Sequence, residues 1–211
     1  RGRPATRKGN PSAQPAGLSP LPTAQRQAAE GGVMVQIKFI VKASEEAAES
    51  SFTLEVHNDW APLGAARFMD LVNCNYFMDC RFHRVVSGFM VQFGLAADPA
   101  QYAEWGTKPI KDDPVTQSNT RGRVSFAMRG PDTRSCQLFI NYGDNSSLDE
   151  QGFSPIAEVI DGMEVVDTFY AGYGDYPPRG SGPEPEKIKA QGLEYLKGYP
   201  KLSYIVRTEA L

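Results

Sequence analysis

The sequence predicts a mainly β domain built from short antiparallel strands. Two segments near the start of the domain alternate apolar and polar residues with a period of two, which is the pattern of half-buried strands. Further along, short extended segments are separated by Gly, Pro and Asn, and such spacing is typical of an antiparallel barrel or sandwich. The 211 residues are enough for one such domain with a single core and some additional length.

The two opening strands are predicted at residues 34–41 and 51–57, where Val, Ile, Phe and Leu occupy alternate positions. The acidic turn at residues 44–49 between them favours an antiparallel pair. A helix follows over residues 62–73, with Pro62 in its first turn and an apolar face at helical spacing.

The rest of the domain is predicted to be mostly short strands with one more helix. The second helix is expected at residues 162–170, a Pro/Gly-rich loop at 177–186 and a closing strand at 201–207. The intervening strands are expected at residues 81–86, 90–93, 124–128, 137–141 and 156–160.

The first 32 residues differ in composition from the rest of the chain. They are rich in Pro, Gly and Ala, lack periodic apolar residues, and carry five basic residues against Glu30 alone. We therefore expect residues 1–32 to form a basic, low-complexity linker or disordered arm. A separate hypothesis is that this arm docks on the body of the protein or on a partner subunit. Residues 33–211 are expected to form the folded domain.

Charge and hydropathy limit the classes of partner. Of the 22 basic and 25 acidic residues, 17 and 24 lie after residue 32, so the domain is acidic and nucleic acid is not expected as a partner. No apolar run approaches the ~18 residues that a membrane span needs, so the chain is not expected to cross a membrane. It begins with Arg1 rather than methionine, which indicates a processed or shortened chain. The arm is similar in composition to organellar leader sequences, but composition does not fix a compartment.

The cysteines and histidines do not match a known metal pattern. Cys74, Cys80 and Cys136 are too few, and odd in number, for a disulfide-stapled domain, and we expect free thiols. Their spacing fits no zinc motif, and only His57 and His83 are available as further ligands. No metal and no cofactor are therefore expected.

Three segments in order carry a resemblance to a known family: FHRVVSGFMVQFG at 82–94, GRVSFAMRGPDTRSCQLFIN at 122–141 and LDEQGFSPIAEVIDGMEVVD at 148–167. They resemble the cyclophilins, and the likeness spans about residues 34–206. The AGYGDYPPRG loop is most similar to the single-domain cyclophilins common in bacteria. The resemblance implies a closed antiparallel β-barrel capped by two α-helices. It also implies peptidyl-prolyl cis–trans isomerase activity on proline-containing protein substrates, which assists protein folding.

The resemblance also implies the site residues. Arg84 matches the family's catalytic arginine, a permanent cation that can hydrogen-bond the proline nitrogen as the amide twists. His83, beside it, is interpreted as a packing residue, because amide rotation needs no general base. Substrate-binding positions implied in the same way are Phe89, Met90, Gln92, Ala127, Met128, Gln137, Phe139, Leu148 and Phe153.

Some positions depart from the family. Phe153 stands where many members have histidine, which changes the pocket rim modestly. Met128 stands where many have an asparagine that holds the substrate through its backbone, so the change of side chain need not matter. Ser147 stands where many eukaryotic members have tryptophan, and this implies weaker binding of the drug cyclosporin.

Two readings of function remain open. The first is an active prolyl isomerase. The alternative is a binding module or structural subunit of a larger assembly, with weak or incidental isomerase activity, which the basic arm favours somewhat. A Ser–His hydrolase fits poorly, because the sequence has no G-x-S-x-G elbow.

Overall fold

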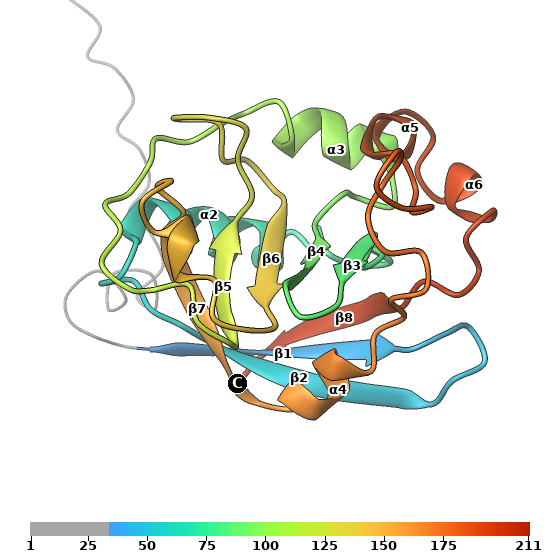
Figure 1. Ribbon diagram of the computed structural model, residues 1–211, viewed down its shortest axis with the longest axis horizontal. Helices are drawn as coiled ribbons and strands as arrows, with labels where there is room; N and C mark the ends of the chain where they lie inside the picture. The colour runs from blue at the N-terminus through green and yellow to red at the C-terminus, as the bar shows by residue number, and fades with distance from the viewer. Residues whose placement is uncertain (1–33) are drawn as a thin grey trace, which may run out of the picture. The chain divides into compact units, whose positions relative to one another are not determined.

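The computed structural model describes residues 34–211. The predicted arm at 1–32 and its proposed docking contact lie outside the described residues. Within them, the mainly β, antiparallel prediction is confirmed. Eight strands form one curled sheet in the order β3-β4-β6-β5-β7-β2-β1-β8 (Figure 1). The strands are β1 (Val35–Lys42), β2 (Glu49–Val56), β3 (Arg84–Val86), β4 (Met90–Phe93), β5 (Arg123–Phe126), β6 (Leu138–Asn141), β7 (Pro155–Asp161) and β8 (Tyr204–Ala210).

The two ends of the sheet are joined by backbone hydrogen bonds rather than by a ladder between β3 and β8. The segment before β3 bonds the start of β8, with the Asp79 amide 2.8 Å from the Ile205 carbonyl oxygen and the Ile205 amide 3.0 Å from the Cys80 carbonyl oxygen. The Phe82 amide donates to the Ser203 carbonyl oxygen at 2.9 Å. These bonds satisfy groups that an open edge would leave unpaired, so they bring the curled sheet close to a closed barrel.

Aromatic rings fill the interior of the curled sheet. The fully buried ring of Phe39 on β1 contacts four other rings at centroid distances of 5.0–6.3 Å, namely those of Phe52, Phe68, Phe77 and Phe93. Burying large aromatic side chains together in this way supplies much of the hydrophobic stabilisation of a small barrel.

Within residues 34–211, five α-helices lie around the sheet, more than the two that were expected. The first, α2 (Pro62–Asn73), has the predicted bounds and buries Phe68, Leu71 and Val72. The predicted helix at 162–170 is shorter, because α4 (Met163–Asp167) ends where the Thr168 hydroxyl bonds the Val165 carbonyl oxygen. The helices that the sequence analysis missed are α3 (Pro99–Trp105), α5 (Pro185–Gln191) and α6 (Leu193–Leu196).

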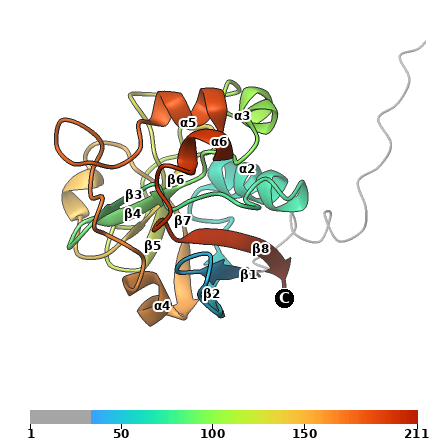
Figure 2. The ribbon, with the colours of Figure 1, turned by 90° about the vertical axis from the view of Figure 1, so that its right-hand side faces the viewer.

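The missed helices are short, so their apolar pattern is too brief to be periodic. Asp98 caps α3 by accepting a hydrogen bond from the Ala100 amide, and Pro99 occupies its first turn. Pro185 starts α5 in the same way, so the Pro/Gly-rich loop ends at residue 184 rather than 186. In both views α3, α5 and α6 lie together on one side of the molecule, and α4 lies on the opposite side (Figures 1 and 2).

A buried ion pair anchors the start of α2. The Asp113 carboxylate accepts hydrogen bonds from the Leu63 and Gly64 amides at 3.0 and 2.8 Å, which occupy two of the unpaired amides at a helix N-terminus. The same carboxylate lies 3.0 Å from Nη2 of Arg134, whose side chain is only 1% exposed. Arg134 also pairs with Asp112 at 3.1 Å. The helix is therefore tied to the loops at 111–113 and 130–135.

Candidate active site

Strand register places three of the predicted site residues in one row. Arg84 on β3 is the direct partner of Gln92 on β4, and Gln92 is the direct partner of Phe139 on β6. Directly paired residues of neighbouring antiparallel strands point to the same face of a sheet. Residues 55 positions apart in sequence therefore share one surface, and this row forms the base of the site.

The apolar part of the site is a small cluster distinct from the main core. Met90, Phe139 and Leu148 are its buried members, and Phe89, Ala127 and Phe153 are among the residues packed against them. The Phe139 and Phe153 rings meet edge to face, with centroids 5.7 Å apart at 76°. This cluster offers a surface suited to a small apolar ring.

The polar part of the site is a chain of hydrogen-bonded side chains. Arg84 Nη1 donates to Gln92 Oε1 at 3.1 Å, and Gln92 Nε2 donates to Gln137 Oε1 at 3.1 Å. The backbone carbonyl of Gln137 accepts from the Ala127 amide at 2.9 Å. Each member orients the next, so the arginine and both amides are held in place before any substrate binds.

An aspartate that the sequence analysis did not identify fixes Arg84 from the other side. Arg84 Nε donates to Asp175 Oδ1 at 2.8 Å and Nη2 donates to Oδ2 at 3.1 Å, which is a two-point pair. The side chains are 17% and 12% exposed. The Tyr176 ring lies 5.3 Å from the guanidinium carbon. The arginine is thus partly desolvated yet fully ion-paired.

The environment of Asp175 keeps it ionised. Burial of its carboxyl raises the pKa, but the hydrogen bonds from Arg84 and from the Tyr176 amide outweigh this effect and hold the pKa below the usual value. Arg179 adds a second ion pair at 2.9 Å from the exposed side. The carboxylate is therefore available to hold Arg84 at any pH near neutrality.

The turn that carries Leu148 and Phe153 is held by a network behind the site. Asn119 Nδ2 donates to Asp149 Oδ1 at 2.7 Å and to the Phe153 carbonyl oxygen at 2.8 Å. Ser118 donates to the other Asp149 oxygen at 2.5 Å. Burial raises the Asp149 pKa, and these donors more than offset it, so the pKa lies below its usual value. The network fixes one wall of the apolar cluster.

His83 lies beside the site but not in it. The side chain is buried, and burial lowers its pKa to about 3, so the imidazole is neutral at physiological pH. Among residues 34–211, neither ring nitrogen has a hydrogen-bond partner. This agrees with the interpretation of His83 as a packing residue.

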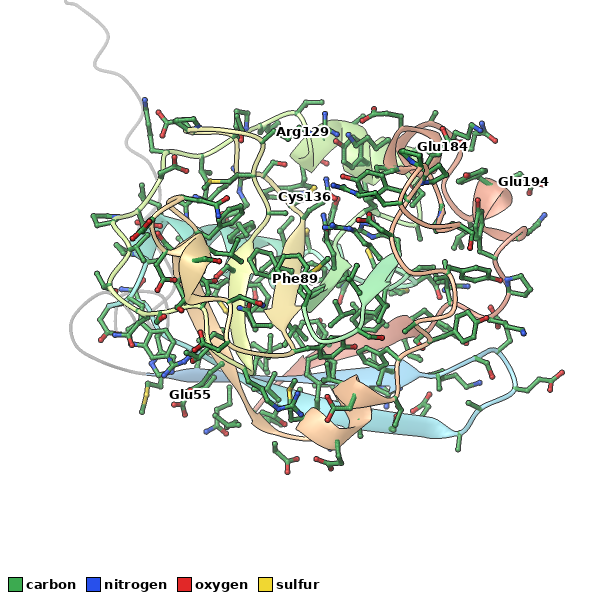
Figure 3. The ribbon with its side chains drawn as sticks, in the orientation of Figure 1. Glu55, Phe89, Arg129, Cys136, Glu184 and Glu194 are labelled. Atoms are coloured by element: carbon green, nitrogen blue, oxygen red, sulfur yellow. The ribbon has the colours of Figure 1, made fainter. Side chains whose placement is uncertain are left out.

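All the predicted site residues line one cavity of about 340 Å³, within the usual range for a ligand pocket. Figure 3 shows Phe89 near the middle of the molecule and Arg129 on the loop above it, and both contribute to this cavity. The lining residues that the sequence analysis missed are Tyr102, Gly106, Arg129, Thr133, Ser135, Tyr176, Pro185 and Lys189.

Three of the missed residues flank the Pro/Gly-rich loop. Tyr176 precedes the loop, and Pro185 and Lys189 belong to α5 after it, so residues on either side of the loop line the cavity. The AGYGDYPPRG motif was the signal that could have pointed to this role. Asp175 and Tyr176 of this motif contact Arg84.

Comparisons with known proteins point to one family. The family model described as cyclophilin type peptidyl-prolyl cis-trans isomerase/CLD matches residues 40–186. Peptidyl-prolyl cis-trans isomerase-like 3 of Dictyostelium discoideum is 37% identical over 120 residues, 54% of this chain and 72% of that protein. Peptidyl-prolyl cis-trans isomerase B of Escherichia coli is 34% identical over 123 residues, 54% of this chain and 74% of that protein.

Solved structures agree with the fold. The crystal structure of a Cryptosporidium parvum cyclophilin type peptidyl-prolyl cis-trans isomerase superposes with a TM-score of 0.62 at 20% identity, covering 85% of this chain and 98% of that one. A second crystal structure of that isomerase, in the presence of the dipeptide Ala-Pro, superposes with a TM-score of 0.59.

The fold and the site define an antiparallel β protein in which an ion-paired arginine and an apolar cluster line one cavity. The chain belongs to the cyclophilin-type peptidyl-prolyl cis–trans isomerases. It is an isomerase of X–Pro peptide bonds and acts on proline-containing peptides. Within residues 34–211, no helix is both long and apolar enough to span a membrane.

Proposed function

We propose that the cavity binds the proline ring of the substrate between Phe89, Met90, Phe139 and Leu148, and that Arg84 is the catalytic residue. The observation that carries this proposal is the position of the Arg84 guanidinium, which is fixed by Asp175 and Gln92 at the edge of the apolar cluster. A proline ring has no polar group to satisfy, so it suits this cluster. The flanking peptide groups then lie beside the glutamines.

The reaction needs a group that favours the twisted amide. Rotation about a peptide bond faces a barrier of ~18–20 kcal/mol, because the nitrogen lone pair is delocalised into the carbonyl. As the bond twists, the lone pair returns to the proline nitrogen, which becomes a hydrogen-bond acceptor. A charge-assisted hydrogen bond that forms only in this twisted state contributes roughly 1.5–3 kcal/mol and speeds the rotation directly.

Arg84 retains donors for this purpose. A guanidinium has five N–H groups. Among residues 34–211, Arg84 uses Nε, one N–H of Nη1 and one of Nη2, so each terminal nitrogen keeps one N–H for the substrate. Because the other three are engaged, little reorganisation is needed when the twisted amide forms.

Gln92 and Gln137 are proposed to hold the substrate backbone, with Ala127 and Met128 beside the peptide and Phe153 at the rim. The two amides already bond one another, which leaves one donor hydrogen on Gln92 Nε2 and both on Gln137 Nε2 for peptide carbonyls. Held at these points, the peptide can rotate about the X–Pro bond only.

The test is cis-to-trans isomerisation of a short X–Pro peptide by the full chain and by Phe139→Ala. The variant removes the largest buried ring of the apolar cluster, and we expect kcat/KM to fall at least tenfold. Met78→Ala, which truncates an exposed side chain outside the cavity, serves as the matched control and should keep the wild-type value. A Phe139→Ala variant as active as the control would refute the assignment of the pocket.

A further inference from the structure

Two carboxylates face each other on the sheet away from the cavity. Glu55 on β2 and Glu158 on β7 are direct register partners. Like charges directly opposite one another destabilise a pair of strands. His57, at the end of β2, lies between them and stacks on Trp60, with ring centroids 3.6 Å apart at 4°. In Figure 3 Glu55 lies well apart from Phe89, so this group is separate from the proline-binding site.

The Nε2 atom of His57 lies close to both carboxylates. Nε2 is 3.5 Å from Glu55 Oε1 and 3.4 Å from Glu158 Oε1, and the three atoms lie within 4.8 Å of one another. These separations exceed the 2.7–3.2 Å of an ordinary N–H···O hydrogen bond. The His57 side chain is 9% exposed, and Nε2 is a buried polar atom with no hydrogen-bond partner among residues 34–211.

The spacing matches the edge of a metal-coordination tetrahedron. Two ligand atoms that each lie about 2.1 Å from a tetrahedral Zn²⁺ are about 3.4 Å apart. The outer carboxylate oxygens face other groups. Gln36 Nε2 donates to Glu55 Oε2 at 3.2 Å, and Arg123 Nη1 lies 3.5 Å from Glu158 Oε2 as an ion pair without a hydrogen bond. The inner oxygens, Oε1 of each carboxylate, are the ones that face His57.

We propose that Glu55, His57 and Glu158 form a binding site for a divalent transition-metal ion of the zinc class. One imidazole and two carboxylates suit Zn²⁺, whereas Ca²⁺ and Mg²⁺ prefer oxygen ligands only. Bound metal neutralises the opposed carboxylates and links β2 to β7. The outer partners Gln36 and Arg123 orient the carboxylates, as supporting groups do in metal sites.

The sequence analysis expected no metal because it searched for ligands close together in sequence. Here the third ligand comes from a strand 101 positions beyond His57, and only the β2–β7 register brings it near. The alternative is that no metal binds here and that a protonated His57 forms ion pairs with Glu55 and Glu158. The two alternatives predict opposite results when metal is added, namely saturable binding or none.

The first test is calorimetric titration of the metal-free full chain with ZnCl₂. The titration is made in a Cys74→Ser background, because Cys74 is an exposed free thiol that could bind zinc by itself. We expect one Zn²⁺ per chain and at least a hundredfold weaker binding in His57→Ala. Glu158→Gln preserves the shape of its side chain and should also weaken binding at least tenfold, while Glu150→Gln, which changes an exposed carboxylate outside the group, should not. CaCl₂ should not bind here.

The second test uses Trp60 as a local reporter. In a Trp105→Phe variant Trp60 is the sole tryptophan, and a paramagnetic ion bound to His57 should quench its emission. Titration with CoCl₂ is expected to saturate at one equivalent and to be reversed by ZnCl₂. The isomerase rate should be the same with and without zinc. Absence of saturable binding, or equal zinc affinity in the wild type and His57→Ala, would overturn the proposal and leave the ion pair.

Discussion

The Asp175 carboxylate accepts two hydrogen bonds, of 2.8 and 3.1 Å, from the guanidinium of Arg84, although the residues are 91 positions apart in sequence. The carboxylate comes from the segment that follows α4, and the arginine comes from β3. This pair explains how a long, flexible side chain at the edge of a cavity keeps one orientation. An arginine side chain without such a partner loses about 2 kcal/mol of side-chain entropy when it is fixed. The Arg84–Asp175 pair therefore reduces the cost of forming the proposed hydrogen bond to the twisted amide.

Loss of the Asp175 carboxylate should lower the rate of isomerisation without abolishing substrate binding in the cavity. We predict that Asp175→Ala lowers kcat for an X–Pro peptide about tenfold and changes KM less than threefold. Asp175 acts through Arg84, so the double variant with Arg84→Ala should be no slower than Arg84→Ala alone. Arg179→Ala, which removes the exposed partner of the same carboxylate, should stay within twofold of the wild type. Additive losses in the double variant would contradict the positioning role.

The activity should not depend on pH across the neutral range. The Asp175 pKa lies below its usual value, and His83, with a pKa of about 3, does not titrate there either. The contribution of the Arg84–Asp175 pair is fully present above the ordinary Asp pKa of about 3.9 and is lost only as the pH falls through the lower folded value. We predict kcat/KM constant within twofold from pH 5 to pH 8. An inflection between pH 6 and 7 would implicate a titrating histidine.

The buried His83 makes the stability of the domain, unlike its activity, sensitive to mild acid. Its pKa is about 3 in the folded state and about 6.5 when exposed, so below pH 6.5 the unfolded chain binds a proton that the folded chain does not. Stability therefore falls as the pH drops from 6.5 towards 3, by up to about 1.4 kcal/mol per unit. Urea unfolding at pH 7.0 and 5.0 should show the wild type losing about 2 kcal/mol more than His83→Gln. Equal losses would mean that His83 is protonated in the folded protein.

Among the ion pairs of residues 34–211, we expect the pair of Arg134 and Asp113 to cause the largest loss of stability when it is broken. Both side chains are almost fully buried, and Asp113 also binds the first amides of α2. We predict that Asp113→Asn destabilises the domain by about 3–5 kcal/mol in urea unfolding, because it leaves a buried guanidinium without its full counter-charge. Lys111→Ala removes an exposed pair to Asp132 and should change the free energy of unfolding far less, because solvent screens that pair. Similar losses in both variants would contradict this ranking.

The sequence predicted the parts of the fold that have a local pattern. The period-two alternation of β1 and β2 and the apolar face of α2 follow directly from which residues must be buried. Bounds were accurate where turn residues are adjacent, as at Met90–Phe93. Helices α3, α5 and α6 were missed, because each is too short to display a period and depends on tertiary contacts for its stability.

The same distinction holds for the site. The residues in the FHR–GFM–Q segment and the strand that follows could be named because a family motif carries them. Asp175 and Tyr176 could not be named, since a charged residue and a tyrosine in a Gly/Pro-rich loop have no local pattern that assigns them a partner. Only the folded path of the chain brings the loop against Arg84.

The central claim is that Arg84 carries the isomerisation, and its most direct test compares the wild type with Arg84→Ala on a short X–Pro peptide. We predict that kcat/KM falls a hundredfold or more, which corresponds to about 2.7 kcal/mol of transition-state stabilisation. Circular dichroism should show an unchanged fold, since Arg84 lies at the cavity edge and not in the main core. Arg84→Lys should stay severely impaired, because an ammonium group cannot reproduce the two-point pair with Asp175. An Arg84→Ala variant within twofold of the wild type would contradict the account.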